Sequence, residues 1–359
     1  MAQQRSTSTP LTRRTLLIGS SAATFVGVAG CASADATPPS EPATSAPAAE
    51  EQRARPLKID QTDAQRKATI ESLTHLDDHP LYSLTWAGEP AALTPPEDAE
   101  AGGQLTGFAC TLFAASAPDG SALVARNFDW DPGPASVMES TLSSGRQTLA
   151  VTDLRYSGIE SESDLDDQTK AAGLGRAEAY AFDGINDAGV FIGLAADYQA
   201  EPNVASGRKW IGGLGIQRMV LDHAESLEDA LDLFDDHNVD FTGGPGLHYL
   251  LADRSGAKAV VEFDAGTMQV IRPPQGQPWM CLENFHMSTT PEDQRSGQRR
   301  YSTCADTLSS AEGKVSVDEA VGLLDDVRQS HTQWQSVYDL SKGTLRVIAE
   351  KSHDFAFAG

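Results

Sequence analysis

The stretch that decides the fold is G-F-A-C-T-L-F-A-A-S-A-P-D-G-S-A-L-V-A-R-N-F-D-W-D, residues Gly107–Asp131. Two apolar runs flank a P-D-G turn, which predicts a β-hairpin with a short glycine-containing loop. Cys110 begins the first strand, and Arg126 and Asp129 are predicted just past the end of the second. Because a hairpin returns its second strand beside the start of its first, we expect these three side chains to meet at one edge of a sheet.

These three residue types favour nucleophilic chemistry. A guanidinium beside a thiol favours the ionised thiolate, and a nearby carboxylate can hold the guanidinium or an amine in place. The alternative is structural, because a single Cys in an apolar strand is usually a small buried hydrophobe. An Arg and an Asp three residues apart are likewise often a surface pair.

The order of motifs resembles a known family. C-T, a P-D-G turn and then R-N-F-D-W are similar to the nucleophile hairpin of the choloylglycine hydrolase and penicillin V acylase family, with acid ceramidase as a more distant relative. These are N-terminal-nucleophile amide hydrolases, in which the Cys is the first residue of the mature chain. Cys110, Arg126 and Asp129 match that motif residue by residue, so the resemblance implies a catalytic role for each.

Residues 1–30 are predicted to be an export signal. Arg13-Arg14 precede the apolar run Leu16–Val28, which is short for a membrane span, and twin arginines indicate the Tat route. V-A-G-C ending at Cys31 resembles a bacterial lipobox, although an ordinary signal peptide with a chance Cys remains the alternative. Residues 31–60 begin with a run of Ala, Pro, Ser and Thr, which predicts a flexible tether. We therefore expect an exported protein anchored by lipid to the extracytoplasmic face of the membrane.

The remaining residues are enough for one large domain. Residues 61–109 read as a helix over Gln65–Leu76, a turn into a strand, and a Pro-, Ala- and Gly-rich loop over Glu89–Gln104. D-D-x-P-L-Y in this part resembles the segment upstream of the nucleophile in linear amide hydrolases, where it belongs to a propeptide. The hydrolase domain is then 110–359.

Downstream of the first hairpin, strands and helices alternate in groups. The predicted strands are Thr148–Tyr156, the hairpin Phe182–Leu194, the pair Leu247–Ala252 and Lys258–Phe263, Met268–Ile271, Trp279–Glu283, and the last pair Thr332–Asp339 and Thr344–Ile348. Helices are predicted over Ile216–Asp236, after Gln298–Tyr301, and over Val317–Arg328, the last opened by the capping box Ser316-x-x-Glu319. Hairpins with separate helices indicate an α+β fold with antiparallel sheets.

The same resemblance implies further site residues. Asn284 matches a position that contributes to the family's oxyanion hole, and an amide is a suitable donor there. Arg300 is the better match to an Arg near the active Cys, and Arg299 is its competitor. The family's other oxyanion Asn falls on Ala196, which departs from the pattern and argues against a bile-salt substrate.

Other patterns limit the remaining functions. No C-x-x-C or H-E-x-x-H supports a metal site, and no cofactor is expected. Cys281 and Cys304 are predicted to be buried thiols, with a disulfide as the alternative in an exported protein. His248 is predicted to be strand structure, with a general base as the alternative. A formal net charge of −24 argues against nucleic-acid binding.

The resemblance implies the four-layer α-β-β-α sandwich of N-terminal-nucleophile hydrolases. It implies hydrolysis of a small N-acyl amide, a linear non-peptide amide, after the chain cuts itself before Cys110. Two alternatives remain open at this point. One is acyl transfer to an amine, as in the related acyl-CoA:6-aminopenicillanic acid acyltransferase, and the other is a tethered lipoprotein that binds a ligand without catalysis.

Overall fold

The computed structural model describes residues 61–89, 109–165, 173–242 and 244–357. The predicted signal peptide, the tether with Cys31 and most of the loop Glu89–Gln104 lie outside these residues. Within the described ranges, no helix is long and apolar enough to cross a membrane.

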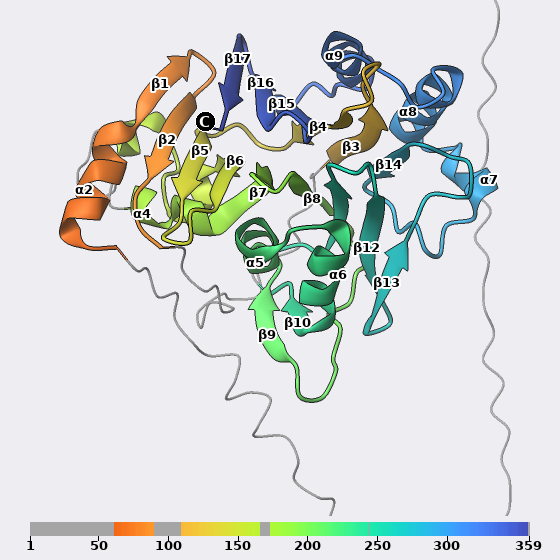
Figure 1. The fold of residues 1–359 in the computed structure, drawn as a ribbon, viewed down its shortest axis with the longest axis horizontal. Helices are drawn as coiled ribbons and strands as arrows, with labels where there is room; N and C mark the ends of the chain where they lie inside the picture. The colour runs from red at the N-terminus through yellow and green to blue at the C-terminus, as the bar shows by residue number, and fades with distance from the viewer. Residues whose placement is uncertain (1–60, 90–108, 166–172, 243, 358–359) are drawn as a thin grey trace, which may run out of the picture. The chain divides into compact units, whose positions relative to one another are not determined.

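A nine-stranded sheet forms one half of the fold (Figure 1). In spatial order its strands are β1 Thr74–Asp77, β2 Leu81–Trp86, β5 Ala135–Thr141, β6 Gln147–Asp153, β7 Ala181–Asn186, β8 Val190–Ala196, β11 Leu247–Asp253, β12 Lys258–Asp264 and β13 Thr267–Ile271. Neighbours are antiparallel except β2 and β5, which run parallel. The upstream segment therefore supplies two strands of this sheet, with Leu84 and Trp86 buried.

A six-stranded antiparallel sheet forms the other half and contains the first hairpin. Its strands, in spatial order, are β14 Met280–Glu283, β3 Ala109–Ser116, β4 Ala122–Asp129, β15 Thr332–Asp339, β16 Thr344–Ile348 and β17 Ser352–Ala356. The turn between β3 and β4 closes where Gly120 takes a φ of +91°, a backbone conformation that favours glycine. A small parallel pair, β9 Lys209–Gly212 and β10 His237–Asp240, completes the strands of the described chain.

Helices cover the outer faces of both sheets. α5 Gly215–His223 and α6 Leu227–Asp235 lie against β7, β8 and β11, whereas α8 Arg299–Ser310 and α9 Val317–Asp326 lie against β14, β3, β4 and β15. Between the sheets, Leu112 and Phe128 share an apolar core with Phe191. This order of helix, sheet, sheet and helix confirms the α-β-β-α sandwich. The remaining short helices are α2 Asp63–Ser72, α4 Leu174–Ala177, α7 Glu292–Arg295, and the 3₁₀ turns η1 Leu154–Ser157, η2 Glu162–Asp164 and η3 Glu178–Tyr180.

Several predicted boundaries need correction. β4 does not end before Arg126, as predicted, but runs to Asp129, because its pairing with β3 and β15 continues through the polar residues. The helix zone Ile216–Asp236 is two helices, since Ser226 is extended and caps α6 by accepting a hydrogen bond from the Asp229 backbone. The predicted helix Gln65–Leu76 is wrong at its end, because α2 ends at Ser72 and Thr74–Asp77 forms β1 by pairing with β2. Strands β1, β5, β9, β10 and β17 are absent from the sequence-based prediction.

Candidate active site

The pairing of β3 with β4 decides which side chains meet. Cys110 lies opposite Phe128, Leu112 lies opposite Arg126, and Ala109 lies opposite Asp129. Arg126 and Asp129 are therefore inside the second strand, not just past its end as the sequence predicts. Directly opposed residues of antiparallel strands lie close together, so the register brings both charged groups to the start of β3.

Arg126 contacts the thiol directly. Its Nη2 donates to Sγ of Cys110 at 3.3 Å, and both side chains are fully buried. Nη1 donates to the Phe182 carbonyl and to Oδ2 of Asp183, each at 2.7 Å. Asp183, on β7, in turn accepts hydrogen bonds from the hydroxyls of Ser336 and Tyr338. The guanidinium is thus held by a carboxylate from the opposite sheet.

Asp183 is a site residue that sequence reasoning missed. It lies in the F-D-G-I-N segment, which the sequence predicts only as one strand of a hairpin. An isolated Asp–Gly pair is a common turn signal, so nothing in the local sequence points to a partner for Arg126. The sequence offers only an indirect indication, because a buried Arg on β4 needs a buried anion from elsewhere in the chain.

Burial sets the protonation state of the thiol. It raises the pKa of Cys110 above its ordinary value; the Arg126 charge opposes this rise, and the Asp129 charge adds to it. In a chain whose Ala109–Cys110 bond is intact, Cys110 is therefore a neutral thiol at neutral pH. A group that accepts its proton would be needed to make it a strong nucleophile.

Asn284 contacts the backbone nitrogen of Cys110. The Cys110 N–H donates to Oδ1 of Asn284 at 2.5 Å, and Nδ2 of Asn284 donates to the Ala196 carbonyl at 2.8 Å. Asn284 is brought here because it follows β14, which pairs with β3. At the position where the family resemblance places a second amide donor, Ala196 offers a carbonyl acceptor instead.

Arg300 lies in the site and Arg299 does not. Nη1 of Arg300 donates to the Cys110 carbonyl at 2.6 Å and to the Thr111 hydroxyl at 2.8 Å. Glu283 pairs with its Nη2 at 2.8 Å. Arg299, one residue earlier at the start of α8, instead donates to the Asp326 carbonyl at 3.5 Å.

Asp129 is buried beside Arg300. Their charged atoms lie 3.6 Å apart, and the Thr332 hydroxyl donates to Oδ1 of Asp129. Burial raises the pKa of Asp129 to about 6, while the Thr332 hydrogen bond and the Arg300 charge oppose the rise. This carboxyl can therefore change its charge within a unit or so of neutral pH.

The other two described cysteines do not form a disulfide. Cys281 and Cys304 are free and buried in the apolar layer under α8 and α9. His248 is also buried, with Nδ1 2.9 Å from Oε1 of Glu262, in a second cluster that the sequence did not indicate.

Comparisons with known proteins identify the family. Residues 116–354 match the family described as acyl-coenzyme A:6-aminopenicillanic acid acyl-transferase. The chain belongs to this family. The matched residues begin after Cys110, so the match covers most of the fold but not the thiol. No curated protein matches the chain in sequence.

Solved structures agree on the fold. A point mutant of conjugated bile acid hydrolase from Clostridium perfringens is 13% identical, with a TM-score of 0.50, and the alignment covers 69% of this chain and 92% of that one. Penicillin V acylase from Agrobacterium tumefaciens is 13% identical, with a TM-score of 0.47 and coverage of 67% and 83%. The family match, together with the fold of the bile acid hydrolase, confirms the resemblance seen in the sequence. The family and fold support an amide hydrolase or acyltransferase of the N-terminal-nucleophile type.

Proposed function

We propose that the protein hydrolyses a linear N-acyl amide with Cys110 as nucleophile, after cutting its own chain between Ala109 and Cys110. The observation that carries the proposal is the pair of contacts on Cys110, with Arg126 on its sulfur and Asn284 on its nitrogen. A buried backbone N–H needs an acceptor in any protein, but a structural Cys needs no guanidinium on its sulfur. When the base is the α-amine of the nucleophile itself, neighbouring groups must fix the positions of both the sulfur and the nitrogen.

Cutting makes the base. In the uncut chain the Cys110 nitrogen is an amide and is not basic. The Cys110 sulfur attacks the Ala109 carbonyl, the acyl group moves from nitrogen to sulfur, and water cleaves this thioester. The products are a carboxylate on Ala109 and a free thiol and amine on Cys110. An α-amine has a pKa of about 8, so part of it is neutral at pH 7 and can take the thiol proton.

The charged neighbours then have defined roles in turnover. The thiolate, stabilised by Arg126, attacks the substrate carbonyl; the amine product leaves with a proton, and water cleaves the acyl-thioester to a carboxylic acid. Asp129 holds the α-ammonium group. Asn284 Nδ2 carries two hydrogens, so it can bond Ala196 with one and offer the other to the oxyanion.

An intact-mass measurement on active protein tests this proposal. We expect a fragment that begins at Cys110, together with hydrolysis of fatty-acyl or phenylacetyl amides in a panel of linear substrates. The upstream fragment should co-purify, because β2 is paired with β5 and its Trp86 is buried. An active enzyme whose Ala109–Cys110 bond is intact would refute the mechanism.

The family match favours a second activity, acyl transfer to an amine. Both reactions pass through the same acyl-thioester and differ only in what attacks it. Product analysis with and without a competing amine separates them. If the amide product dominates at millimolar amine in water, the protein is an acyltransferase. If added amine changes nothing, it is a hydrolase.

We also propose that the protein is exported and lipid-anchored through Cys31. The support is the order of twin arginines, apolar run and V-A-G-C in the sequence. Incorporation of a labelled lipid should disappear in Cys31→Ser. Label that persists in this variant, or a wild-type protein found only in the cytoplasm, would overturn this part. Failure here leaves the catalytic proposal intact.

A further inference from the structure

Asn284 is the first residue past the end of β14, so the strand pairing does not fix its position by itself. β14 pairs with β3 only as far as Glu283, and Asn284 is half-buried. Its amide nevertheless keeps one orientation, with Oδ1 2.5 Å from the Cys110 nitrogen and Nδ2 2.8 Å from the Ala196 carbonyl. The groups that hold the segment 284–288 against the nine-stranded sheet therefore decide where the Nδ2 hydrogens point.

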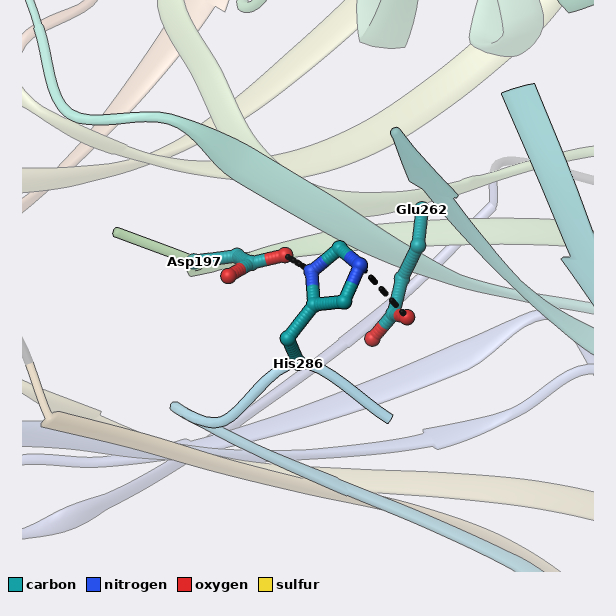
Figure 2. A group of neighbouring side chains, drawn as sticks. All are labelled: Asp197, Glu262 and His286. Atoms are coloured by element: carbon teal, nitrogen blue, oxygen red, sulfur yellow. Dashed lines mark hydrogen bonds and ion pairs between the residues drawn. The ribbon is translucent and has the colours of Figure 1, made fainter. Parts of the chain in front are cut away.

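One of these groups is a buried pair formed by His286 and Asp197 (Figure 2). Nδ1 of His286 lies 2.5 Å from Oδ2 of Asp197, and because a carboxylate only accepts, Nδ1 is the donor. Both side chains are 1% exposed. Asp197 is next to Ala196, and His286 is two residues past Asn284. The His286–Asp197 bond therefore joins the same two segments as the Asn284–Ala196 bond.

Glu262 on β12 holds the rest of the segment. Its Oε1 accepts from the Met287 backbone at 2.7 Å, and its Oε2 accepts from the Ser288 backbone at 2.8 Å. Nδ1 of His248, on β11, lies 2.9 Å from the same Oε1. Figure 2 shows the His286 ring between the carboxylates of Asp197 and Glu262.

The four ionisable side chains form a closed group. Two imidazoles face two carboxylates, so the charges balance when both rings are protonated, and all four side chains are at most 1% exposed. A buried, hydrogen-bonded group of this kind holds its members in place more firmly than an exposed ion pair does. The segment that carries Asn284 is thus anchored from behind by groups that solvent does not reach.

We propose that His286 and Asp197 are positioning residues that fix the Asn284 amide for the reaction. The inference rests on the proposed role of Asn284 as a donor to the oxyanion. The amide group is planar, so holding one Nδ2 hydrogen on the Ala196 carbonyl also sets the direction of the other. Within the described residues neither His286 nor Asp197 contacts Cys110, so the pair acts through Asn284.

The expected consequence is a slower acylation of Cys110 at each working site. An oxyanion donor must lie about 2.7–3.1 Å from the developing charge, and its loss costs roughly 100- to 1,000-fold in rate. A misplacement of about 1 Å can cost roughly 100-fold. A role in stability alone would instead lower the number of folded enzyme molecules and leave the rate at each of them unchanged.

Burst kinetics on the cut enzyme separates these two effects. With p-nitrophenyl phenylacetate, the acyl group moves to the Cys110 sulfur and one p-nitrophenolate is released per reactive thiol. The burst amplitude therefore counts working sites, the burst rate constant measures acylation at each, and Cys110→Ala gives the blank. His286→Phe, which keeps a ring but removes the donor, should lower the rate constant by about 10- to 100-fold. His286→Asn, whose amide nitrogen can replace Nδ1, should stay within about fivefold of the wild type.

A double-mutant cycle with Asn284→Asp shows whether the pair acts through Asn284. The Asp side chain has the same shape and still accepts from the Cys110 nitrogen, but it has no N–H to offer. This variant alone should lower the burst rate constant by about 100-fold or more. In its background, His286→Phe should change the rate constant by less than about twofold, because no donor is left to misplace.

Two further variants complete the experiment. The matched control is His353→Phe, which breaks a different His–carboxylate pair, 3.1 Å from Asp77, and should leave the rate constant within about twofold in both backgrounds. Asp197→Asn weakens the same hydrogen bond by removing its charge and serves in the cycle if His286→Phe does not fold. It should lower the rate constant by about 3- to 10-fold in the wild-type background only.

Three results would overturn the inference. The first is a wild-type burst rate constant in His286→Phe, or a loss in His286→Asn as large as in His286→Phe. The second is a loss on breaking the pair that is as large in the Asn284→Asp background as in the wild type; the proposed role of Asn284 would then stand without the pair. The third is a wild-type rate constant in Asn284→Asp, which would remove the proposed role of Asn284 and this inference with it.

Discussion

Cys110 and Cys281 are buried on neighbouring strands of one sheet but on opposite faces. Cys281 on β14 lies opposite Phe113 on β3, so these two share a face, and Cys110, three residues before Phe113, is on the other. The face of Cys110 carries Arg126, whereas Asp129 lies on the other face at the end of β4, beside Arg300. The face of Cys281 carries Cys304 and apolar side chains.

The two thiols show that burial alone does not make a cysteine inert or reactive. Burial raises the pKa of both, and for Cys281 the rise is large because its neighbours are Cys304 and Glu283 rather than a cation. At Cys110 the guanidinium of Arg126 opposes the rise. In this sheet the reactive thiol differs from the packing thiol because a cation, the Arg126 guanidinium, contacts its sulfur.

Removing the two sulfurs one at a time is the strongest test of the comparison. Cys110→Ala should abolish both chain cutting and turnover, because no atom remains to attack either carbonyl, while Cys281→Ala should leave both intact. Cys110→Ser should cut slowly, since a hydroxyl is the weaker nucleophile. Electrophoresis and amide hydrolysis measure the two effects. Chain cutting that persists in Cys110→Ala would show that Cys110 is not the reactive thiol of the pair.

Removing the cation from the reactive face should cost both rate and stability. Arg126→Ala is expected to lower turnover by about 100-fold or more. The sequence alone suggests that this variant keeps its fold, but the structure adds a cost of about 3–5 kcal/mol in unfolding free energy, because Asp183 stays buried without its partner.

A double variant isolates the source of that cost. Arg126→Met with Asp183→Leu should recover much of the stability and none of the activity, since the buried charge is gone but the thiol still lacks its cation. Urea unfolding and hydrolysis rates measure the two separately. If Arg126→Ala is as active as the wild type, the guanidinium is only structural.

The reactive face was largely predictable because its first members are close in sequence. A hairpin with Cys at one end and Arg and Asp at the other brings all three together by its register, whatever the rest of the chain does. Asn284 and Arg300 were found only through the family resemblance, since β14 and α8 reach Cys110 by tertiary pairing. The choice between Arg299 and Arg300 depends on the rotation of α8, which sequence spacing does not fix.

Contacts between the sheets were not predictable. Asp183 meets Arg126, and Asp197 meets His286, only because the two sheets stack, and no spacing along the chain encodes that packing. Strands β5 and β17 also depend on pairing with distant segments, since β5 lies between β2 and β6 and β17 pairs with β16 at the edge of its sheet. The extension of β4 to Asp129 likewise depends on β15 at its other side.

The pH dependence of the stability of the uncut protein should report the ionisation of Asp129. The pKa of Asp129 is about 6 in the folded chain, above its usual value of about 3.9. A raised carboxyl pKa means that the folded state binds the proton more tightly. The contribution of this group to stability is therefore fully present below pH 4 and is lost as the pH rises through 6, an effect of about 3 kcal/mol.

The Cys110→Ala protein is suited to this measurement because it stays uncut. Its unfolding free energy should fall between pH 4 and 7 relative to that of Cys110→Ala with Asp129→Asn, which lacks the titrating group. Parallel curves for the two proteins would show that Asp129 does not titrate in this range. In the cut enzyme the new α-ammonium of Cys110 should lower the pKa of Asp129. The acid limb of the pH profile of kcat/KM should therefore lie at or below about pH 6.

The smallest effects are expected on the apolar face. Cys281→Ala and Cys304→Ala should each cost about 1–2 kcal/mol in unfolding free energy, because each removes one buried sulfur from a packed layer. Turnover should stay within about twofold of the wild type, since neither thiol is among the described contacts of Cys110.

Iodoacetamide should modify Cys110 in the processed enzyme but leave Cys281 and Cys304 unmodified until the protein is unfolded, because a protonated buried thiol is a poor nucleophile. Modification of Cys281 in the folded enzyme at the rate of Cys110 would show that the two faces do not differ in reactivity, and the charged surroundings of Cys110 would then not explain its chemistry.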